Sequence, residues 1–143
     1  MVNEGVHRQS GKAFAIKIVN KFRLNEADAA ALQDEISILQ EFRDDKHFDQ
    51  SHIVRLIDVF EGTDYFYLVT EKIDGGCLYQ RIRDKGGYGE DEARLACRTL
   101  FSALEFTHAR NVVHRDLKLE NLLLTVGRCI LSLADAPVED SGV

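Results

Sequence analysis

The chain has 143 residues, with 18 lysines and arginines against 24 aspartates and glutamates, which gives a formal net charge of −6. This length can hold one domain. The acidic balance argues against a protein whose main task is nucleic-acid binding, because such proteins present a basic surface to phosphates. The three cysteines are widely spaced without a C-x-x-C pair, which argues against a zinc site or a disulfide framework. With no apolar run long enough for a membrane span and a polar start unlike a signal peptide, we expect a cytoplasmic protein that binds no membrane.

The first half of the chain predicts a small antiparallel sheet with one helix. A helical pattern covers Asn25–Phe42, with Asn25 as its N-cap and an apolar stripe at Leu32, Ile36 and Leu39. Short apolar runs predict strands at Ala13–Val19, Ile53–Phe60 and Tyr65–Thr70. The turn Gln9–Lys12 before the first of them indicates that Val2–His7 is its partner strand in a hairpin.

The second half has a more helical character. After the turn at Asp74–Gly76, helices are predicted at Leu78–Arg83 and Glu90–Ala109. The apolar stripe of the longer helix consists of Ala93, Ala96, Cys97, Leu100, Phe101 and Leu104. A loop then leads to two short apolar runs, Leu122–Thr125 and Cys129–Leu133. We therefore predict an α+β fold with two parts, residues 1–73 and residues 74–143.

The loop before these runs contains His114–Asn121, with the sequence HRDLKLEN. It resembles the catalytic loop H-R-D-L-x-x-x-N of the eukaryotic protein kinases, and all the fixed positions match. The resemblance implies that Asp116 accepts the proton of the substrate hydroxyl and that Lys118 places a positive charge near the transferred phosphoryl group. It implies that Asn121 binds Mg²⁺, a cation that prefers oxygen ligands. Lysine at position 118 is typical of the serine/threonine kinases.

A second resemblance lies upstream, where Ala15-Ile16-Lys17 is similar to the V-A-I-K strand motif of the same family. Taken alone, a lysine in an apolar strand is more often an edge residue that extends its charge into solvent. Glu35, however, lies on the apolar face of the predicted helix, where a carboxylate is costly unless it is paired. A Lys17–Glu35 ion pair would explain both residues, and the family uses such a pair beside the ATP phosphates.

The segment Tyr67–Ile73 is similar to the last strand and the hinge that bind adenine in this family. The resemblance implies that Thr70 is the gatekeeper and that Glu71 and Ile73 contact adenine through their backbones. Ala15 and Val2 are also assigned to the ATP site by the resemblance. Without the neighbouring motifs, this segment would be interpreted only as the end of a strand.

The resemblance covers nearly the whole chain, but a complete kinase domain needs roughly 250 residues. We therefore expect a kinase-like fold truncated at both ends, with a partial N-lobe of antiparallel sheet plus one regulatory helix and the start of a helical C-lobe. The glycine loop G-x-G-x-x-G-x-V is missing, and Val2 matches its last position. Asp135 matches the magnesium-binding aspartate of D-F-G, but Ala136-Pro137 follow it, and Asp140 is a weaker alternative.

Within the family, the chain is most similar to the calcium/calmodulin-dependent protein kinases, especially type I, on the segments Gly5–Lys17 and Asp74–Leu78. This implies an ATP- and Mg²⁺-dependent serine/threonine kinase with a protein substrate. Calmodulin is a candidate partner for a full-length relative, but its binding segment would lie beyond this C-terminus. The missing glycine loop and altered D-F-G lead us to expect that this chain alone is inactive. The alternative is a non-catalytic, pseudokinase-like binding module.

Overall fold

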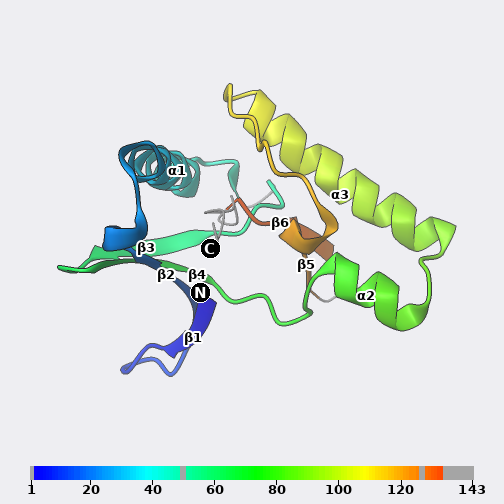
Figure 1. Ribbon diagram of the computed structural model, residues 1–143. Helices are drawn as coiled ribbons and strands as arrows, with labels where there is room; N and C mark the ends of the chain where they lie inside the picture. The colour runs from blue at the N-terminus through cyan, green and yellow to red at the C-terminus, as the bar shows by residue number, and fades with distance from the viewer. Residues whose placement is uncertain (1, 49–50, 126–127, 134–143) are drawn as a thin grey trace. The chain divides into compact units, whose positions relative to one another are not determined.

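The computed structural model describes residues 2–48, 51–125 and 128–133. The chain forms two compact units, one made of Met1–Asp45 and Arg55–Lys72 and the other of Lys46–Val54 and Ile73–Val143 (Figure 1). No helix among the described residues is long and apolar enough to cross a membrane.

The first unit is built on a four-stranded antiparallel sheet with the order β1-β2-β4-β3. Its strands are β1 (Val2–Val6), β2 (Ala13–Asn20), β3 (Leu56–Glu61) and β4 (Tyr65–Glu71). Because side chains alternate between the two faces of a strand, Val19 and Leu68 lie in the core, with exposed fractions of 7% and 0%. A short 3₁₀ turn, η1 (Lys21–Arg23), follows β2.

Helix α1 (Glu26–Asp44) lies against one face of this sheet (Figure 1). Its predicted N-cap is confirmed, because the Asn25 side chain accepts a hydrogen bond from the Asp28 N–H at 2.8 Å. Its buried side chains recur every three or four residues and form the stripe that packs into the first unit: Leu32, Ile36, Leu39 and Phe42.

The second unit combines α2 (Leu78–Lys85), α3 (Glu90–His108) and a hairpin of β5 (Leu122–Thr125) and β6 (Arg128–Leu131). Helix α3 packs against β6. The prediction of one strand over Ile53–Phe60 was wrong at its start, since β3 begins at Leu56. Ile53 instead forms a parallel bridge with Leu131, and the Val54 N–H donates to the Leu131 carbonyl at 2.9 Å. These contacts place the two apolar residues in the second unit.

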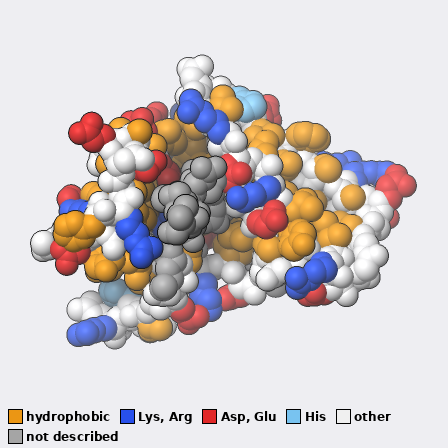
Figure 2. Space-filling model, viewed as in Figure 1, with side chains coloured by type: hydrophobic (Ala, Val, Ile, Leu, Met, Phe, Trp, Pro, Cys, Tyr) orange, Lys and Arg blue, Asp and Glu red, His pale blue; other side chains and the backbone are white. Residues whose placement is uncertain are grey.

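The buried face of α3 differs from the predicted stripe. Phe101 is 64% exposed and Cys97 is also exposed, although both were expected to be buried. The side chains that the helix does bury are mostly small, and they allow it to pack closely on its neighbours: Ala96, Thr99, Ala103, Phe106 and Thr107. Orange hydrophobic side chains are correspondingly visible at the surface in the region of α3 (Figure 2).

The turn before α2 runs very close to β5. The Gly75 N–H donates to the Leu124 carbonyl and the Leu124 N–H donates to the Gly76 carbonyl, both at 2.8 Å. A methyl group on Gly75 would lie 2.1 Å from the Leu124 carbonyl oxygen. Gly76 has a φ of +71°, which a glycine adopts without strain. The glycines therefore permit a backbone contact that side chains would block.

Candidate active site

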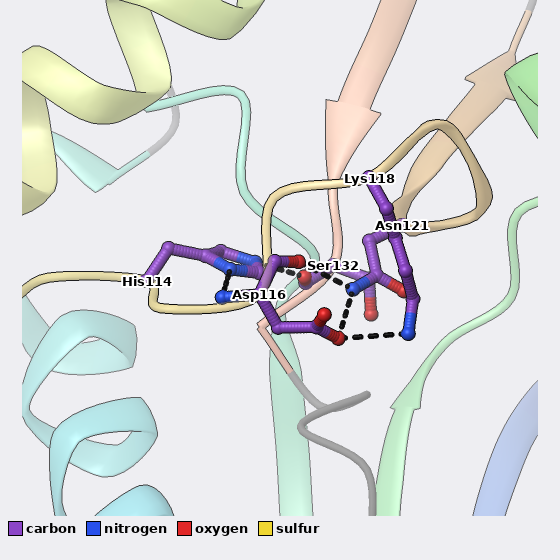
Figure 3. Close-up of polar contacts among 5 residues, drawn as sticks. All are labelled: His114, Asp116, Lys118, Asn121 and Ser132. Atoms are coloured by element: carbon purple, nitrogen blue, oxygen red, sulfur yellow. Dashed lines mark hydrogen bonds and ion pairs between the residues drawn. The ribbon is translucent and has the colours of Figure 1, made fainter.

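Three side chains of the HRDLKLEN loop form one polar cluster (Figure 3). The Asp116 Oδ2 atom lies 2.8 Å from Lys118 Nζ and accepts a hydrogen bond from Asn121 Nδ2 at 3.0 Å. The same Asn121 nitrogen donates to the Asp116 carbonyl oxygen at 2.9 Å. Asn121 is only 1% exposed, so its amide is held in this orientation. The structure therefore brings together the three loop residues that the sequence analysis named for catalysis and metal binding.

These contacts favour the ionised form of the Asp116 carboxyl. The hydrogen bond from Lys118 is the main cause that lowers the pKa of Asp116 below its ordinary value, and the hydrogen bond from Asn121 lowers it further. Partial desolvation acts in the opposite direction without reversing the shift. At neutral pH the carboxylate can therefore accept a hydrogen bond, and then a proton, from a nearby hydroxyl group.

His114 fixes the loop to the segment after β6. Its Nδ1 accepts a hydrogen bond from the Asp116 N–H at 3.2 Å, and its Nε2 lies 2.8 Å from the Ser132 carbonyl oxygen (Figure 3). Since Nδ1 accepts, the hydrogen of the neutral ring is on Nε2, which donates to Ser132. Arg115, between the two loop residues, has a φ of +64°, a conformation that is uncommon for a residue with a side chain.

The loop ends in a 3₁₀ turn, η3 (Leu119–Asn121), which leads directly into β5. The Ser132 N–H donates to the Asn121 carbonyl at 2.8 Å, so Ser132 is hydrogen-bonded to both ends of the loop. Sequence reasoning missed Ser132. It contributes only backbone groups to these bonds, so its residue type carries no signal.

The predicted Lys17–Glu35 ion pair is present in the first unit. Lys17 Nζ lies 3.5 Å from Glu35 Oε1, and both side chains are 15% exposed. Lys17 belongs to β2 and Glu35 to α1, so the pair connects the sheet to the helix. Low exposure reduces solvent screening and strengthens the attraction between the two charges.

The strand register shows on which face of the sheet the other residues assigned to the ATP site in the first unit lie. Val2 is opposite Lys17, and Ala15 is opposite Thr70. Because directly opposed residues point to the same side and Ala15 and Lys17 are two positions apart, these four residues share one face of the sheet. Thr70 is 8% exposed.

Glu71 forms hydrogen bonds to Arg55, the residue just before β3, through both its backbone and its side chain. Its N–H donates to the Arg55 carbonyl at 3.0 Å, and its Oε1 accepts from the Arg55 N–H at 2.8 Å. Of the remaining predicted site residues, Ile73 belongs to the second unit, and Asp135 and Asp140 lie outside the described residues. Within the described ranges, no three His, Cys, Asp or Glu side chains form a metal-binding group.

Comparison with known proteins identifies the family. Residues 1–136 match the model of the protein kinase domain. The chain belongs to the protein kinase family. It is 42% identical over 123 residues to a probable myosin light chain kinase of Dictyostelium discoideum, covering 86% of this chain and 30% of the relative. It is 39% identical over 122 residues to the calcium/calmodulin-dependent protein kinase type I of Schizosaccharomyces pombe, covering 85% of this chain and 35% of that kinase.

The fold is also similar to a crystal structure of Rad53 in complex with AMP-PNP, with a TM-score of 0.80 and 29% sequence identity. This match covers 92% of the chain and 34% of the Rad53 chain. This chain therefore spans about a third of the length of each of these three proteins. The predicted kinase-like α+β fold and the resemblance to calcium/calmodulin-dependent kinases are confirmed by these comparisons.

Proposed function

We propose that this chain contributes the ATP-binding residues and the catalytic loop of a serine/threonine protein kinase, which transfers the γ-phosphoryl group of ATP to a hydroxyl of a protein substrate. The observation that carries the proposal is the Asp116 carboxylate held by Lys118 and Asn121 at 2.8 and 3.0 Å. An ionised carboxylate with an adjacent cation suits a reaction that removes a hydroxyl proton while negative charge spreads over the phosphoryl oxygens.

In this proposal Asp116 orients the substrate hydroxyl and accepts its proton. The lowered pKa of Asp116 keeps the carboxyl ionised, so its oxygens can accept a hydrogen bond from the hydroxyl and orient it, although the same shift makes the carboxylate a weaker base. Lys118, whose Nζ lies 2.8 Å from Asp116 Oδ2, would place its positive charge near the transferred group. His114 keeps the loop in position through its bonds to Asp116 and Ser132.

The first unit supplies the proposed nucleotide contacts. Lys17 would bind the α- and β-phosphates, and Glu35 would hold the lysine side chain in place. Val2, Ala15 and Thr70 would line the adenine site with apolar and small side chains. Glu71 would hydrogen-bond adenine through its backbone, and the same role is proposed for Ile73, which is not part of the first unit. This assignment is supported by the shared sheet face of the first unit and by the neighbour Rad53, whose structure contains AMP-PNP.

The residues of the second unit also fit Mg²⁺. This ion is commonly held in kinases by one or two protein oxygens together with phosphates, so a cluster of three acidic side chains is not required. The Asn121 Nδ2 group is directed at Asp116, which leaves the carbonyl side of the amide as the ligand it could offer. Asp135 is the proposed second ligand, with Asp140 as its alternative. The bound ion would offset the negative charge of the phosphates.

We propose a protein substrate and no nucleic-acid partner. Basic and acidic side chains are interspersed on the face shown in Figure 2, unlike the continuous basic surface of a nucleic-acid-binding protein. The cysteines of the described residues are free thiols, which supports the proposed cytoplasmic location.

Calorimetric titration of the chain with Mg²⁺-ATP tests the nucleotide assignment. We expect binding by the wild type and at least about tenfold weaker binding by Lys17→Ala, because the variant lacks the phosphate-binding charge. Lys12→Ala is the matched control, since it removes an exposed lysine that precedes the same strand. No binding to the wild type at millimolar ATP would refute the proposed function.

Phosphoryl transfer to a serine-containing peptide tests the catalytic assignment. The missing glycine loop leads us to expect little or no transfer by the wild-type chain alone, so any transfer that it does show should fall at least about a hundredfold in Asp116→Asn, with ATP binding unchanged. Asp91→Asn, at an exposed position of α3, is the control that should transfer normally. Transfer by the wild type that Asp116→Asn leaves unchanged would refute the catalytic role of Asp116.

A further inference from the structure

An ion pair in the first unit connects two segments that are not neighbours in the sheet. Glu4 Oε2 lies 2.9 Å from Lys72 Nζ, and the side chains are 55% and 33% exposed. Glu4 is in β1, whereas Lys72 directly follows β4. Strand β2 lies between β1 and β4, so the pair reaches across an entire strand.

The strand register shows where this pair crosses. Glu4 is opposite Ala15, and Ala15 is opposite Thr70. Opposed residues share a face, and Val2 is two positions from Glu4, so Val2, Glu4, Ala15 and Thr70 all point to the same side. That side carries the residues that the proposed function assigns to adenine. The Glu4–Lys72 pair therefore starts from the same face of the sheet as the residues assigned to adenine.

The Glu4–Lys72 pair adds to the contacts of strand β1. Among the described strands it is an edge of the sheet and pairs only with β2. Val2 and Val6, at its ends, are 58% and 61% exposed, so little apolar burial holds the strand in place. An edge strand with few buried contacts opens more readily than a central one. A charged contact to Lys72 restricts this opening.

We propose that Glu4 and Lys72 are a positioning pair for adenine. The pair holds β1, which carries Val2, at a set distance from the segment next to Glu71, whose backbone is proposed to contact the base. This inference rests on the proposed function, because it concerns the same nucleotide site. The pair acts through the placement of Val2 and the hinge and does not itself bind the phosphates.

Adenosine binding measures this role separately from phosphate binding. We expect Glu4→Gln and Lys72→Gln each to weaken adenosine and ATP binding by the same factor, about two- to fivefold, the range of an exposed ion pair. Adding the second substitution to the first should cause little further loss, because the contact is already broken. The exchanged variant, Glu4→Lys with Lys72→Glu, should recover most of the affinity.

Lys21→Gln is the matched control. It breaks the Lys21–Glu61 ion pair at the opposite end of the same sheet, so adenosine affinity should not change. Melting temperatures measured for the same variants distinguish a loss of positioning from a loss of general stability. Equal adenosine affinity in the wild type and in both single variants would overturn the inference while leaving the proposed function intact. Failure of the wild type to bind adenosine and ATP would instead refute the proposed function, and the inference with it.

Discussion

Substitution of Gly75 by alanine tests whether the close contact between the turn and β5 is required. The methyl group would lie 2.1 Å from the Leu124 carbonyl oxygen, which belongs to the backbone and cannot rotate away. Carbon and oxygen atoms rarely approach within about 3.3 Å, so the two segments must separate by about 1 Å. The two hydrogen bonds that connect them are each 2.8 Å long and would then exceed the normal range.

The expected loss follows from those two bonds. Each backbone hydrogen bond contributes about 1 kcal/mol to stability, so their loss costs about 2 kcal/mol. Alanine restricts the unfolded chain more than glycine does, and this effect alone stabilises the folded state by about 0.5 kcal/mol. We therefore expect Gly75→Ala to lower the free energy of unfolding of the second unit by about 1.5 kcal/mol.

Urea unfolding followed by circular dichroism measures this change, and amide hydrogen exchange locates it. We expect the Leu124 amide to exchange at least about tenfold faster in the variant, because a loss of about 1.4 kcal/mol corresponds to that factor. Gly62→Ala is the control. A methyl group there would be 3.5 Å from the Tyr65 carbonyl oxygen, an ordinary contact, so stability should remain close to the wild-type value.

The reasoning would be refuted if Gly75→Ala matched the wild type in unfolding free energy and in the exchange rate of the Leu124 amide. Such a result would mean that the turn accommodates a side chain without moving away from β5. The glycine would then be explained by the turn alone.

Three further predictions concern the loop and the core. Lys118→Met removes the main cause of the lowered Asp116 pKa, so NMR titration should show that pKa moving up. A carboxyl whose pKa is lower in the folded state stabilises the protein at pH values above its unfolded pKa, and this contribution is lost as the pH falls through the folded pKa. Lys118→Met should therefore lose less stability than the wild type when the solution is acidified. His114→Ala removes the contacts to the Asp116 N–H and the Ser132 carbonyl and should cost about 1–3 kcal/mol in urea unfolding. Leu68→Ala, at a side chain that is 0% exposed, should cost about 2–5 kcal/mol, whereas Leu68→Met should cost less than about 1.5 kcal/mol.

Features that depend on local sequence were predictable. Asn25 was identified as an N-cap because its residue type and the following helical pattern are sufficient evidence, and its hydrogen bond to Asp28 is present. The Lys17–Glu35 pair was predicted because a carboxylate on the apolar face of a helix is costly unless it is paired, and because the family resemblance indicated the lysine as its partner. The contacts of Asp116 with its two loop partners likewise involve residues only a few positions apart.

Features that depend on distant parts of the chain were not predictable in this way. Ile53 and Val54 form a continuous apolar run with β3, yet their partner is Leu131, and nothing local distinguishes the two. The stripe predicted for α3 favoured large apolar side chains such as Phe101. The helix instead buries a face rich in small residues, because close packing against β6 determines which side is covered.

The segment Lys46–Val54 has a consequence for how the chain can be divided. It lies between α1 and β3 in the sequence but belongs to the second unit, where the Phe48 ring packs edge-to-face on Phe106 with centroids 6.1 Å apart. A fragment ending at residue 73 would therefore carry Phe48, Ile53 and Val54 without the residues that cover them. During synthesis, Ile53 and Val54 also remain without their Leu131 partner until β6 has left the ribosome, so the second unit completes its core late.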